Sequence, residues 1–209
     1  MPERIALFPL EVVLLPGEVL PLHIFEPCYR LLIHRVMRGS ERMGINLLLE
    51  GRFHAIGCLA SIEQVLRRYQ DGRMDVTVSG LRRYRARTVD EVSQPYWVAE
   101  VEWVEDEANA PDPDLRQACE QLYERLLLII RGHAPEIREL IQEARRVESL
   151  SFYLGKQVGL DLLQRQHLLE TCSEGQRLQW LQQHLQTIIP RLQEMEAFAR
   201  RIRSNGHFP

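Results

Sequence analysis

The sequence predicts an α+β fold in which a strand-rich first half is followed by a helical second half. Up to residue 105, apolar and polar residues alternate within short runs such as "MDVTVSG" and "YWVAEVEWV", which is typical of half-buried strands. From residue 111 onward, apolar residues recur every three or four positions, as on one face of a helix. We therefore expect an antiparallel β subdomain over residues 1–105 and an α-helical bundle over residues 106–209. The acidic, proline-bearing segment 105–114 is the expected linker.

The most unusual stretch is "LFPLEVVLLPGEVLPLHIFEPCYRLLI", which is strongly apolar and yet contains four prolines. A proline has no N–H to give to a sheet ladder, so each one must stand where no donor is needed. Pro16 and Gly17 fit the central positions of a type II turn. Pro9 and Pro21 fit strand starts or sheet edges, and Pro27 fits the first turn of a helix. The stretch therefore predicts two short buried strands, a tight turn and a helix start.

The remainder of the first half predicts one helix and a series of strands. The segment "CYRLLIHRVMRG" has apolar residues on one helical face and ends in Gly39. The Asp71-Gly72 pair is a turn signal between "CLASIEQVLRRY" and "MDVTVSG", which indicates a hairpin. The strands "LRRYRARTV" and "YWVAEVEWV" follow along the chain.

Five helices are predicted in the second half. The first, "PDPDLRQACEQLYERLLLIIRG", has a capping aspartate at its start and Gly132 at its end. Ser173 and Gln176 form a capping box before the last helix, which runs toward Arg203. Pro190 lies inside this last helix and removes one hydrogen bond, so we expect a kink or a break there. The three helices between them are "PEIRELIQEARR", "SLSFYLGKQVG" and "DLLQRQHLLETC".

Charge and composition narrow the classes of function. The 26 basic and 29 acidic residues give a net charge of -3, which disfavours a general binder of nucleic acid or of anionic membranes. The apolar runs are far shorter than the roughly 20 residues that span a bilayer, so no membrane association is expected. The opening "MPERIALF" has no signal-peptide core. The four cysteines are far apart without a CxxC pair, which is typical of reduced thiols in a cytoplasmic protein.

Motifs for catalysis or metal binding are missing from the sequence. The seven histidines form no HExxH, and no serine lies in a GxSxG elbow. A GxxxxGK[ST] phosphate loop is also missing, because the Gly155-Lys156 pair has neither the earlier glycine nor the following hydroxyl residue. We therefore expect no catalytic residue, no metal site and no cofactor.

Four segments together carry a family resemblance. They are "FPLEVVLLPGEVLPLHIFEPCYRLLI", "DGRMDVTVSGLRRYRARTV", "PYWVAEVEW" and "LSFYLGKQVGLDLLQRQHLLETCSEGQRLQWL". In this order, over nearly the whole chain, they resemble the N-terminal domain of Lon protease, the substrate-binding domain at the head of ATP-dependent Lon enzymes. The resemblance implies a PUA-like pseudo-barrel followed by a helical bundle, and a role in handling polypeptide substrates.

The resemblance also implies what the chain does not contain. About 200 residues are used by this domain alone, which implies a stand-alone N-domain protein without the ATPase and the Ser-Lys protease site. It implies a non-catalytic module that binds unfolded or degron-bearing polypeptides, as an adaptor or a chaperone-like protein in protein quality control. The partner expected is an unfolded polypeptide or another protein. The end of the last helix could also pair with a second copy to form a homodimer.

Polypeptide capture needs exposed apolar or aromatic side chains, or an open strand edge. Large aromatic residues at strand spacing are more often part of a core, which is the alternative for each of them. Glu26 and Arg30 stand four residues apart at a helix start. They could form an ion pair worth ~0.5 kcal/mol, or contact a peptide backbone at the mouth of the pseudo-barrel. The residues expected to bind a peptide are Leu15, His23, Phe25, Glu26, Tyr29, Arg30 and Trp97.

A basic strand face offers RNA binding as the alternative function, because PUA-like folds often bind RNA. In "RRYRARTV" the side chains of Arg83, Arg85 and Arg87 share one face of a strand. If this strand pairs with "WVAEVEW", Glu100 and Glu102 meet the arginines across the sheet and the surface is neutral. We favour this paired, solvated face over an RNA-binding one.

Overall fold

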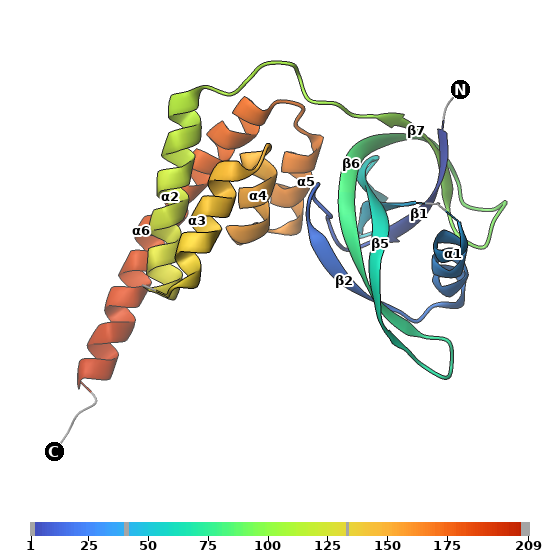
Figure 1. Ribbon diagram of the computed structural model, residues 1–209, viewed down its shortest axis with the longest axis horizontal. Helices are drawn as coiled ribbons and strands as arrows, with labels where there is room; N and C mark the ends of the chain where they lie inside the picture. The colour runs from blue at the N-terminus through green and yellow to red at the C-terminus, as the bar shows by residue number, and fades with distance from the viewer. Residues whose placement is uncertain (1–2, 40–41, 133, 206–209) are drawn as a thin grey trace. The chain divides into compact units, whose positions relative to one another are not determined.

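The structure is a computed structural model that describes residues 3–39, 42–132 and 134–205, with side chains up to residue 199. Within these residues the chain forms seven strands and six helices, which confirms the predicted α+β class (Figure 1). All seven strands precede the long helices, so the order of the two halves is also as predicted.

The chain divides into two compact units, which we call the barrel unit and the helical unit. The barrel unit consists of the described parts of Met1–Asp106 together with Leu160–Cys172. The helical unit consists of the described parts of Glu107–Gly159 and Ser173–Pro209. The short helical segment Leu160–Cys172, which the sequence assigned to the second half, therefore makes its contacts within the first unit.

Strands of the barrel unit are β1 (Glu3–Leu10), β2 (Val19–Ile24), β3 (Met43–Leu49), β4 (Arg52–Phe53), β5 (Ile56–Arg68), β6 (Met74–Asp90) and β7 (Val98–Trp103). Five of them close into a ring in the order β1, β7, β6, β5, β3, because β3 pairs back to β1 (Figure 1). The short strand β4 pairs antiparallel with the end of β3, and β2 pairs with β6 outside the ring. Inside the ring lies a buried core that includes Leu7, Tyr84, Ala99 and Val101.

One pairing in this ring is parallel, although the sequence predicts an antiparallel sheet. Strand β1 runs parallel to β3, with Ala6 opposite Met43 and Leu10 opposite Leu47. A parallel pair needs a long crossover connection, and this one contains β2 and helix α1 (Pro27–Arg38). Alternating side chains in the sequence indicate which face of a strand is buried, but they do not indicate which strand lies beside it. The parallel pairing of β1 with β3 could therefore not be predicted from the sequence.

The proline-bearing stretch folds largely as predicted. Gly17 has a φ of 70°, and the Glu18 N–H donates to the Leu15 carbonyl, which closes the predicted turn. Pro27 stands in the first turn of α1. The prediction of two buried strands is wrong for the second one, since β2 alternates between exposed and half-buried residues before it ends at the buried Ile24. The reason is that β2 lies outside the closed ring, so one of its faces is open to solvent.

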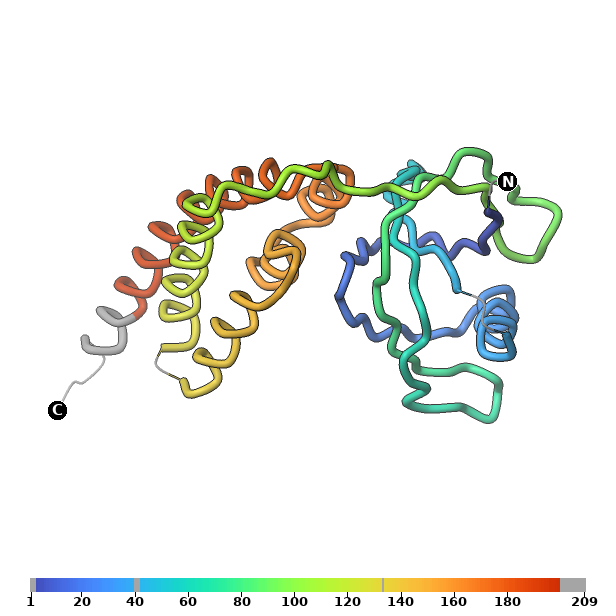
Figure 2. The backbone as a smooth tube through the Cα atoms, turned by 45° about the horizontal axis from the view of Figure 1, so that its top comes forward, coloured from blue at the N-terminus to red at the C-terminus, as the bar shows by residue number. Residues whose placement is uncertain are grey.

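The two longest strands, β5 and β6, form a hairpin that continues past the ring (Figure 2). Its turn contains the predicted Asp71-Gly72 pair, and Gly72 has a φ of 85°. The Gly72 N–H donates to the Tyr69 carbonyl, and the Tyr69 N–H donates to the Arg73 carbonyl. The hairpin tip contacts α1, because the Arg30 guanidinium donates to the Asp71 carbonyl.

Helix α5 (Leu162–Glu170) packs on the barrel. The Arg165 guanidinium donates to the Val13 carbonyl at 2.9 Å, and the Gln166 amide donates to the Ile56 carbonyl at 3.0 Å. These partners lie 152 and 110 residues earlier in the chain. The helical period of this segment is visible in the sequence, whereas its distant partners are not.

Four helices form the helical unit, namely α2 (Pro113–Arg131), α3 (Glu136–Arg146), α4 (Leu150–Gln157) and α6 (Glu174–Asn205). Helix α6 continues through Pro190, so the break that the sequence allowed is absent. One hydrogen bond is lost at a proline inside a helix. Burial of the apolar stripe on the same helix offsets this loss, and the stripe consists of Leu178, Leu181, Leu185 and Ile189.

A buried ion pair lies in the helical unit between two residues of the first turn of α6. The Arg177 side chain is 0% exposed, and its guanidinium donates to the Glu174 carboxylate at 2.7 Å. The same guanidinium donates through Nε to the Ser151 hydroxyl at 2.7 Å and lies 4.2 Å from the centre of the Phe152 ring. The carboxylate also accepts from Ser149 and from the backbone and hydroxyl of Ser151. These bonds hold α6 to α4.

Candidate functional site

Strand β2 has one paired edge and one open edge. It pairs with β6 from Val19 opposite Ser79 onward, and no other described strand pairs with it. In an antiparallel ladder, alternate residues turn their N–H and C=O groups to opposite edges. The Gly80 N–H donates to the Glu18 carbonyl, which sets this alternation. Counting from this bond, the even-numbered residues of β2 bond to β6 and the odd-numbered residues turn their backbone groups outward.

The outward residues are Val19, Pro21 and His23. Their three carbonyls, and the N–H groups of Val19 and His23, point away from β6, and no hydrogen bond to these groups is found in the described part of the chain. Pro21 has no N–H and stands where the ladder requires none, as predicted for a proline at a sheet edge. The side chains of the same three residues are exposed.

Polar and aromatic side chains meet beside this edge. His23 Nδ1 donates to Asp75 Oδ1 at 2.6 Å, and the Tyr69 hydroxyl donates to Asp75 Oδ2 at 2.9 Å. The hydrogen bond from His23, and to a smaller extent the one from Tyr69, holds the pKa of Asp75 below its usual range. The His23 ring stacks on Phe25 with ring centres 6.0 Å apart and meets the edge of Tyr69 at 5.9 Å. The imidazole is therefore fixed between two aromatic rings and a carboxylate.

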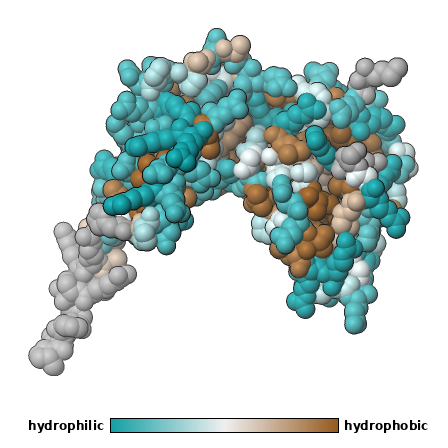
Figure 3. Space-filling view, in the orientation of Figure 1, coloured by the Kyte–Doolittle hydropathy of each residue, from teal (hydrophilic) through white to brown (hydrophobic). Residues whose placement is uncertain are grey.

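Exposed apolar side chains surround the same edge. Val19 is 60% exposed and Phe25 is 57% exposed. Figure 3 shows apolar residues gathered on the barrel unit around β2. Large exposed apolar side chains that gather in one place mark binding surfaces more often than scattered ones do. We call this area the β2 surface, made of Val19, Pro21, His23, Phe25, Tyr69 and Asp75.

Two of the residues predicted to bind a peptide, His23 and Phe25, lie on the β2 surface. The prediction for Leu15 is wrong, because its side chain is 0% exposed and belongs to the core. Leu15 directly precedes the turn at Pro16 and Gly17, and this turn packs on the barrel, so its neighbour is buried. Val19 and Asp75 were missed by the sequence reasoning. The alternation from Val19 to Phe25 could have indicated that Val19 is exposed. The pairing of His23 with Asp75 joins strands that are distant in the sequence, so no local pattern predicts it.

The other predicted residues are not part of the β2 surface. Tyr29 is half-buried, with its ring 4.2 Å from that of Phe8. Trp97 is half-buried beside the core of the ring. The proposed ion pair between Glu26 and Arg30 is not formed, because the Arg30 guanidinium bonds to the hairpin tip instead. Glu26 is exposed just before α1.

The three arginines of the predicted basic face do not form one stripe. Arg83 is buried, and its guanidinium donates to the Leu169 carbonyl at 3.0 Å and to the Asp106 carboxylate. Arg87 forms the predicted cross-strand pair, with its guanidinium 2.6 Å from the Glu102 carboxylate. Helix α5 covers Arg83, and the alternation of residues within one strand could not predict this contact. The solvated, paired face therefore describes this strand better than a row of exposed cations.

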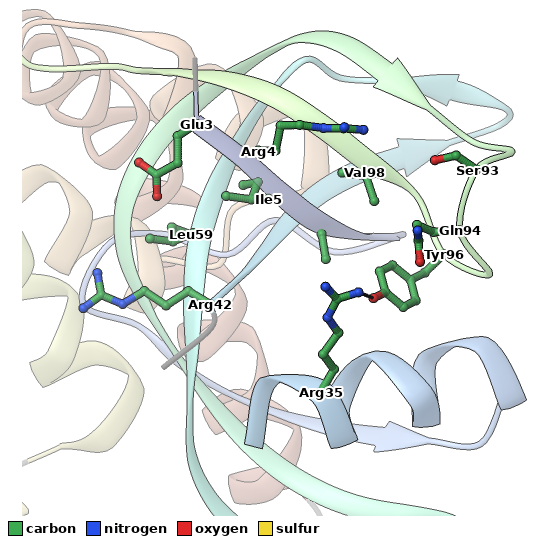
Figure 4. Close-up of a pocket in the computed structure, with 11 residues that line it drawn as sticks. Glu3, Arg4, Ile5, Arg35, Arg42, Leu59, Ser93, Gln94, Tyr96 and Val98 are labelled. Carbon is green, nitrogen blue, oxygen red and sulfur yellow. Dashed lines mark hydrogen bonds between the residues drawn. The ribbon is translucent and has the colours of Figure 1, made fainter. Parts of the chain in front are cut away.

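A separate cavity of about 570 Å³ lies between β1, α1 and the segment before β7 (Figure 4). Its polar lining contains Arg4, Arg35, Arg42 and Glu3, and it shares no residue with the β2 surface. Arg35 points from α1 to the Tyr96 hydroxyl, to which it donates at 2.7 Å. The lining carries three arginines and one glutamate, and Arg4 is paired with Asp90 at 3.6 Å.

Thiol chemistry is disfavoured at the two buried cysteines. Burial raises the pKa of Cys58 to about 12, and burial likewise raises the pKa of Cys119 to about 12. A thiol must lose its proton before it acts as a nucleophile. Among the described residues no group of three or more His, Cys, Asp or Glu is arranged to hold a metal ion. None of the described helices combines the length and apolar character needed to cross a membrane.

The closed ring, the open edge of β2 and the exposed apolar side chains beside it have the features of a binding module. Residues 4–187 match the family described as the ATP-dependent protease La (LON) substrate-binding domain. Because this match covers most of the 209 residues, the chain belongs to that family. The resemblance found in the sequence is thereby confirmed.

Two curated relatives match most of the chain. Lon protease 2 of Syntrophobacter fumaroxidans (strain DSM 10017 / MPOB) is 23% identical over 214 residues, covering 98% of this chain and 27% of the relative. Lon protease of Xanthomonas oryzae pv. oryzae (strain KACC10331 / KXO85) is 26% identical over 187 residues, covering 82% of this chain and 21% of the relative. The chain thus spans about a quarter of the length of the curated relatives that it matches.

Two solved structures share the fold. The Lon N-terminal domain protein from Xanthomonas campestris is 28% identical with a TM-score of 0.67, covering 86% of this chain and 96% of that one. The N-terminal domain of Mycobacterium avium complex Lon protease is 24% identical with a TM-score of 0.69, covering 88% of this chain and 98% of that one. The second likeness shows the fold alone.

Proposed function

We propose that this chain binds unfolded or degron-bearing polypeptides through the β2 surface. The observation that carries the proposal is the pair of exposed apolar side chains, Val19 and Phe25, on and beside an open strand edge. The description of the family as a substrate-binding domain of a protease supports a polypeptide as the ligand class.

The affinity of such a surface comes mainly from apolar contact. Covering an exposed side chain the size of Phe25 contributes roughly 1.5–3 kcal/mol at full burial. The polar group formed by His23, Asp75 and Tyr69 lies in the same area and gives hydrogen-bonding partners for a bound chain. A site of this kind selects unfolded segments, because folded proteins keep their large apolar side chains inside.

The cellular role that fits this activity is an adaptor or a chaperone-like protein in protein quality control in the cytoplasm. In this role the chain presents polypeptides and does not cleave them. The proposal for the chain itself requires neither a nucleotide nor a metal, because apolar contact and backbone hydrogen bonds need no cofactor.

Fluorescence anisotropy with a labelled, permanently unfolded model polypeptide tests the proposal. Phe25→Ala should weaken binding about tenfold, which corresponds to about 1.4 kcal/mol. Phe198→Ala is the matched control, because Phe198 is an exposed phenylalanine that belongs to the helical unit and is not part of the β2 surface. Equal affinities of the two variants would contradict the assignment of the β2 surface.

Binding of single-stranded RNA, measured in parallel at about 50 and about 200 mM salt, distinguishes RNA binding from polypeptide binding. We expect saturable polypeptide binding that persists at the higher salt, because apolar contact is not screened. Binding of RNA alone, falling steeply with salt, would replace the proposal with phosphate recognition.

A further inference from the structure

We propose that the polypeptide binds by adding a strand to the open edge of β2, so that the sheet itself recognises an extended segment. This inference rests on the proposed function and names the substrate class of the same site. It predicts that main-chain hydrogen bonds, and not only apolar contact, carry the recognition.

The backbone of the edge has the pattern that an added strand requires. Val19 and His23 each present an N–H and a C=O outward, and Pro21 presents a C=O. These five groups alternate with the inward-bonding residues at the spacing of a strand. An extended chain matches this spacing with its own backbone, whereas a helix uses its N–H and C=O groups internally.

Pro21 restricts what can be added. The residue of the guest that lies opposite Pro21 finds an acceptor but no donor, so it must itself supply an N–H. A guest segment with proline at that position, or at the positions opposite Val19 and His23, loses the bonds that it would donate. The site therefore selects extended segments free of proline at alternate positions.

Pro21 also disfavours a second copy of this chain as the occupant. Two β2 strands paired symmetrically about Pro21 would place one proline opposite the other, and the central pair would have no N–H at all. Both central carbonyls would then remain without a partner. Proline on an edge strand is a known protection against such self-pairing, so the geometry favours a foreign chain.

The side chains beside the edge define the composition of the guest. Val19 and Phe25 are exposed apolar neighbours on and just beyond the strand, and Leu20 and Leu22 are half-buried on its other face. A guest strand therefore meets apolar surface on both of its faces. Segments rich in β-branched and aromatic residues fit this surface, and these residues also favour the extended conformation. Such segments are exposed in unfolded proteins and hidden in folded ones.

Two substitutions at one position separate strand addition from apolar capture. Val19→Pro keeps an apolar side chain but removes the outward N–H and places the ring in the path of the guest. Val19→Ala keeps the N–H and removes apolar surface. Strand addition predicts at least about tenfold weaker binding for Val19→Pro and only about threefold for Val19→Ala. The reverse order would overturn the inference, and Val92→Ala, at an exposed valine outside the site, is the control.

Amide hydrogen exchange of the wild-type protein tests the same point without a substitution. On saturation with the model polypeptide, the Val19 and His23 amides should exchange at least about tenfold more slowly. The Leu20 and Leu22 amides, which already bond to β6, should be protected in both states. If the polypeptide binds while the Val19 and His23 amides stay unprotected, strand addition is wrong and the proposed function stands. If no polypeptide binds at all, the proposed function itself is wrong.

Discussion

Replacing Arg177 with methionine should destabilise the helical unit by about 3 kcal/mol. Removing one partner of a buried ion pair typically costs about 3–5 kcal/mol, because the other charge is left buried without compensation. Here the Glu174 carboxylate would keep its bonds from Ser149 and from the backbone and hydroxyl of Ser151. These three donors stabilise the remaining charge, which places the expected loss at the lower end of that range.

A double variant tests whether the uncompensated carboxylate causes this loss. The Glu174→Leu and Arg177→Met double variant has no buried charge, so it should be more stable than the Arg177→Met single variant. Urea unfolding followed by far-UV circular dichroism reports the helices, and the two units are fitted as separate transitions because a single two-state fit is not assured. A loss below about 1 kcal/mol for Arg177→Met would refute the reasoning.

Three further predictions concern the barrel unit and the cysteines. Gly44→Ala should lower stability by about 1–3 kcal/mol, because the new Cβ would lie 2.0 Å from the buried Tyr84 hydroxyl. Thermal unfolding measures this loss. Adding Tyr84→Phe to the Gly44→Ala variant should restore part of it. The pKa of Asp75 is lowered by its bond from His23, so its stabilising effect is present above the unfolded-state pKa of roughly 3.9 and is lost as the pH falls through the lower folded-state pKa. Acid unfolding should therefore depend less steeply on pH in Asp75→Asn, and an unchanged profile would contradict the assignment. A thiol reagent should react much faster with two partly exposed cysteines than with two buried ones, namely Cys28 and Cys172 against Cys58 and Cys119.

Features that depend on neighbouring residues in the chain could be predicted from the sequence. The turn at Pro16 and Gly17 and the turn at Asp71 and Gly72 follow from the backbone that these residue types favour, and both are present. The start of α1 at Pro27 follows from the same local chemistry. In each case the signal lies within a few residues of the feature.

Features that depend on distant contacts could not be predicted. The parallel pairing of β1 with β3 and the packing of α5 on the barrel join segments without a shared local pattern. The burial of Arg83 follows from that packing, because α5 covers one face of the strand that alternation showed as open. Knowledge of the neighbours of a strand is needed to say which of its two faces is free.

The candidate site shows both situations. Phe25 follows an edge strand and is exposed, as a peptide-binding residue must be. Leu15 has the same apolar character but is buried, and no periodicity separates the two. The polar partner of His23 comes from another strand, so Asp75 was found only in the structure.

Adding an unfolded polypeptide to the isotope-labelled protein and mapping the NMR chemical-shift changes identifies the residues that contact the ligand. We expect saturable changes centred on Val19, His23 and Phe25, with smaller ones at Tyr69. Changes centred on Arg35 and Tyr96 would place the ligand in the separate cavity, and no changes at all would show that the polypeptide does not bind. Either result would contradict the assignment of the β2 surface.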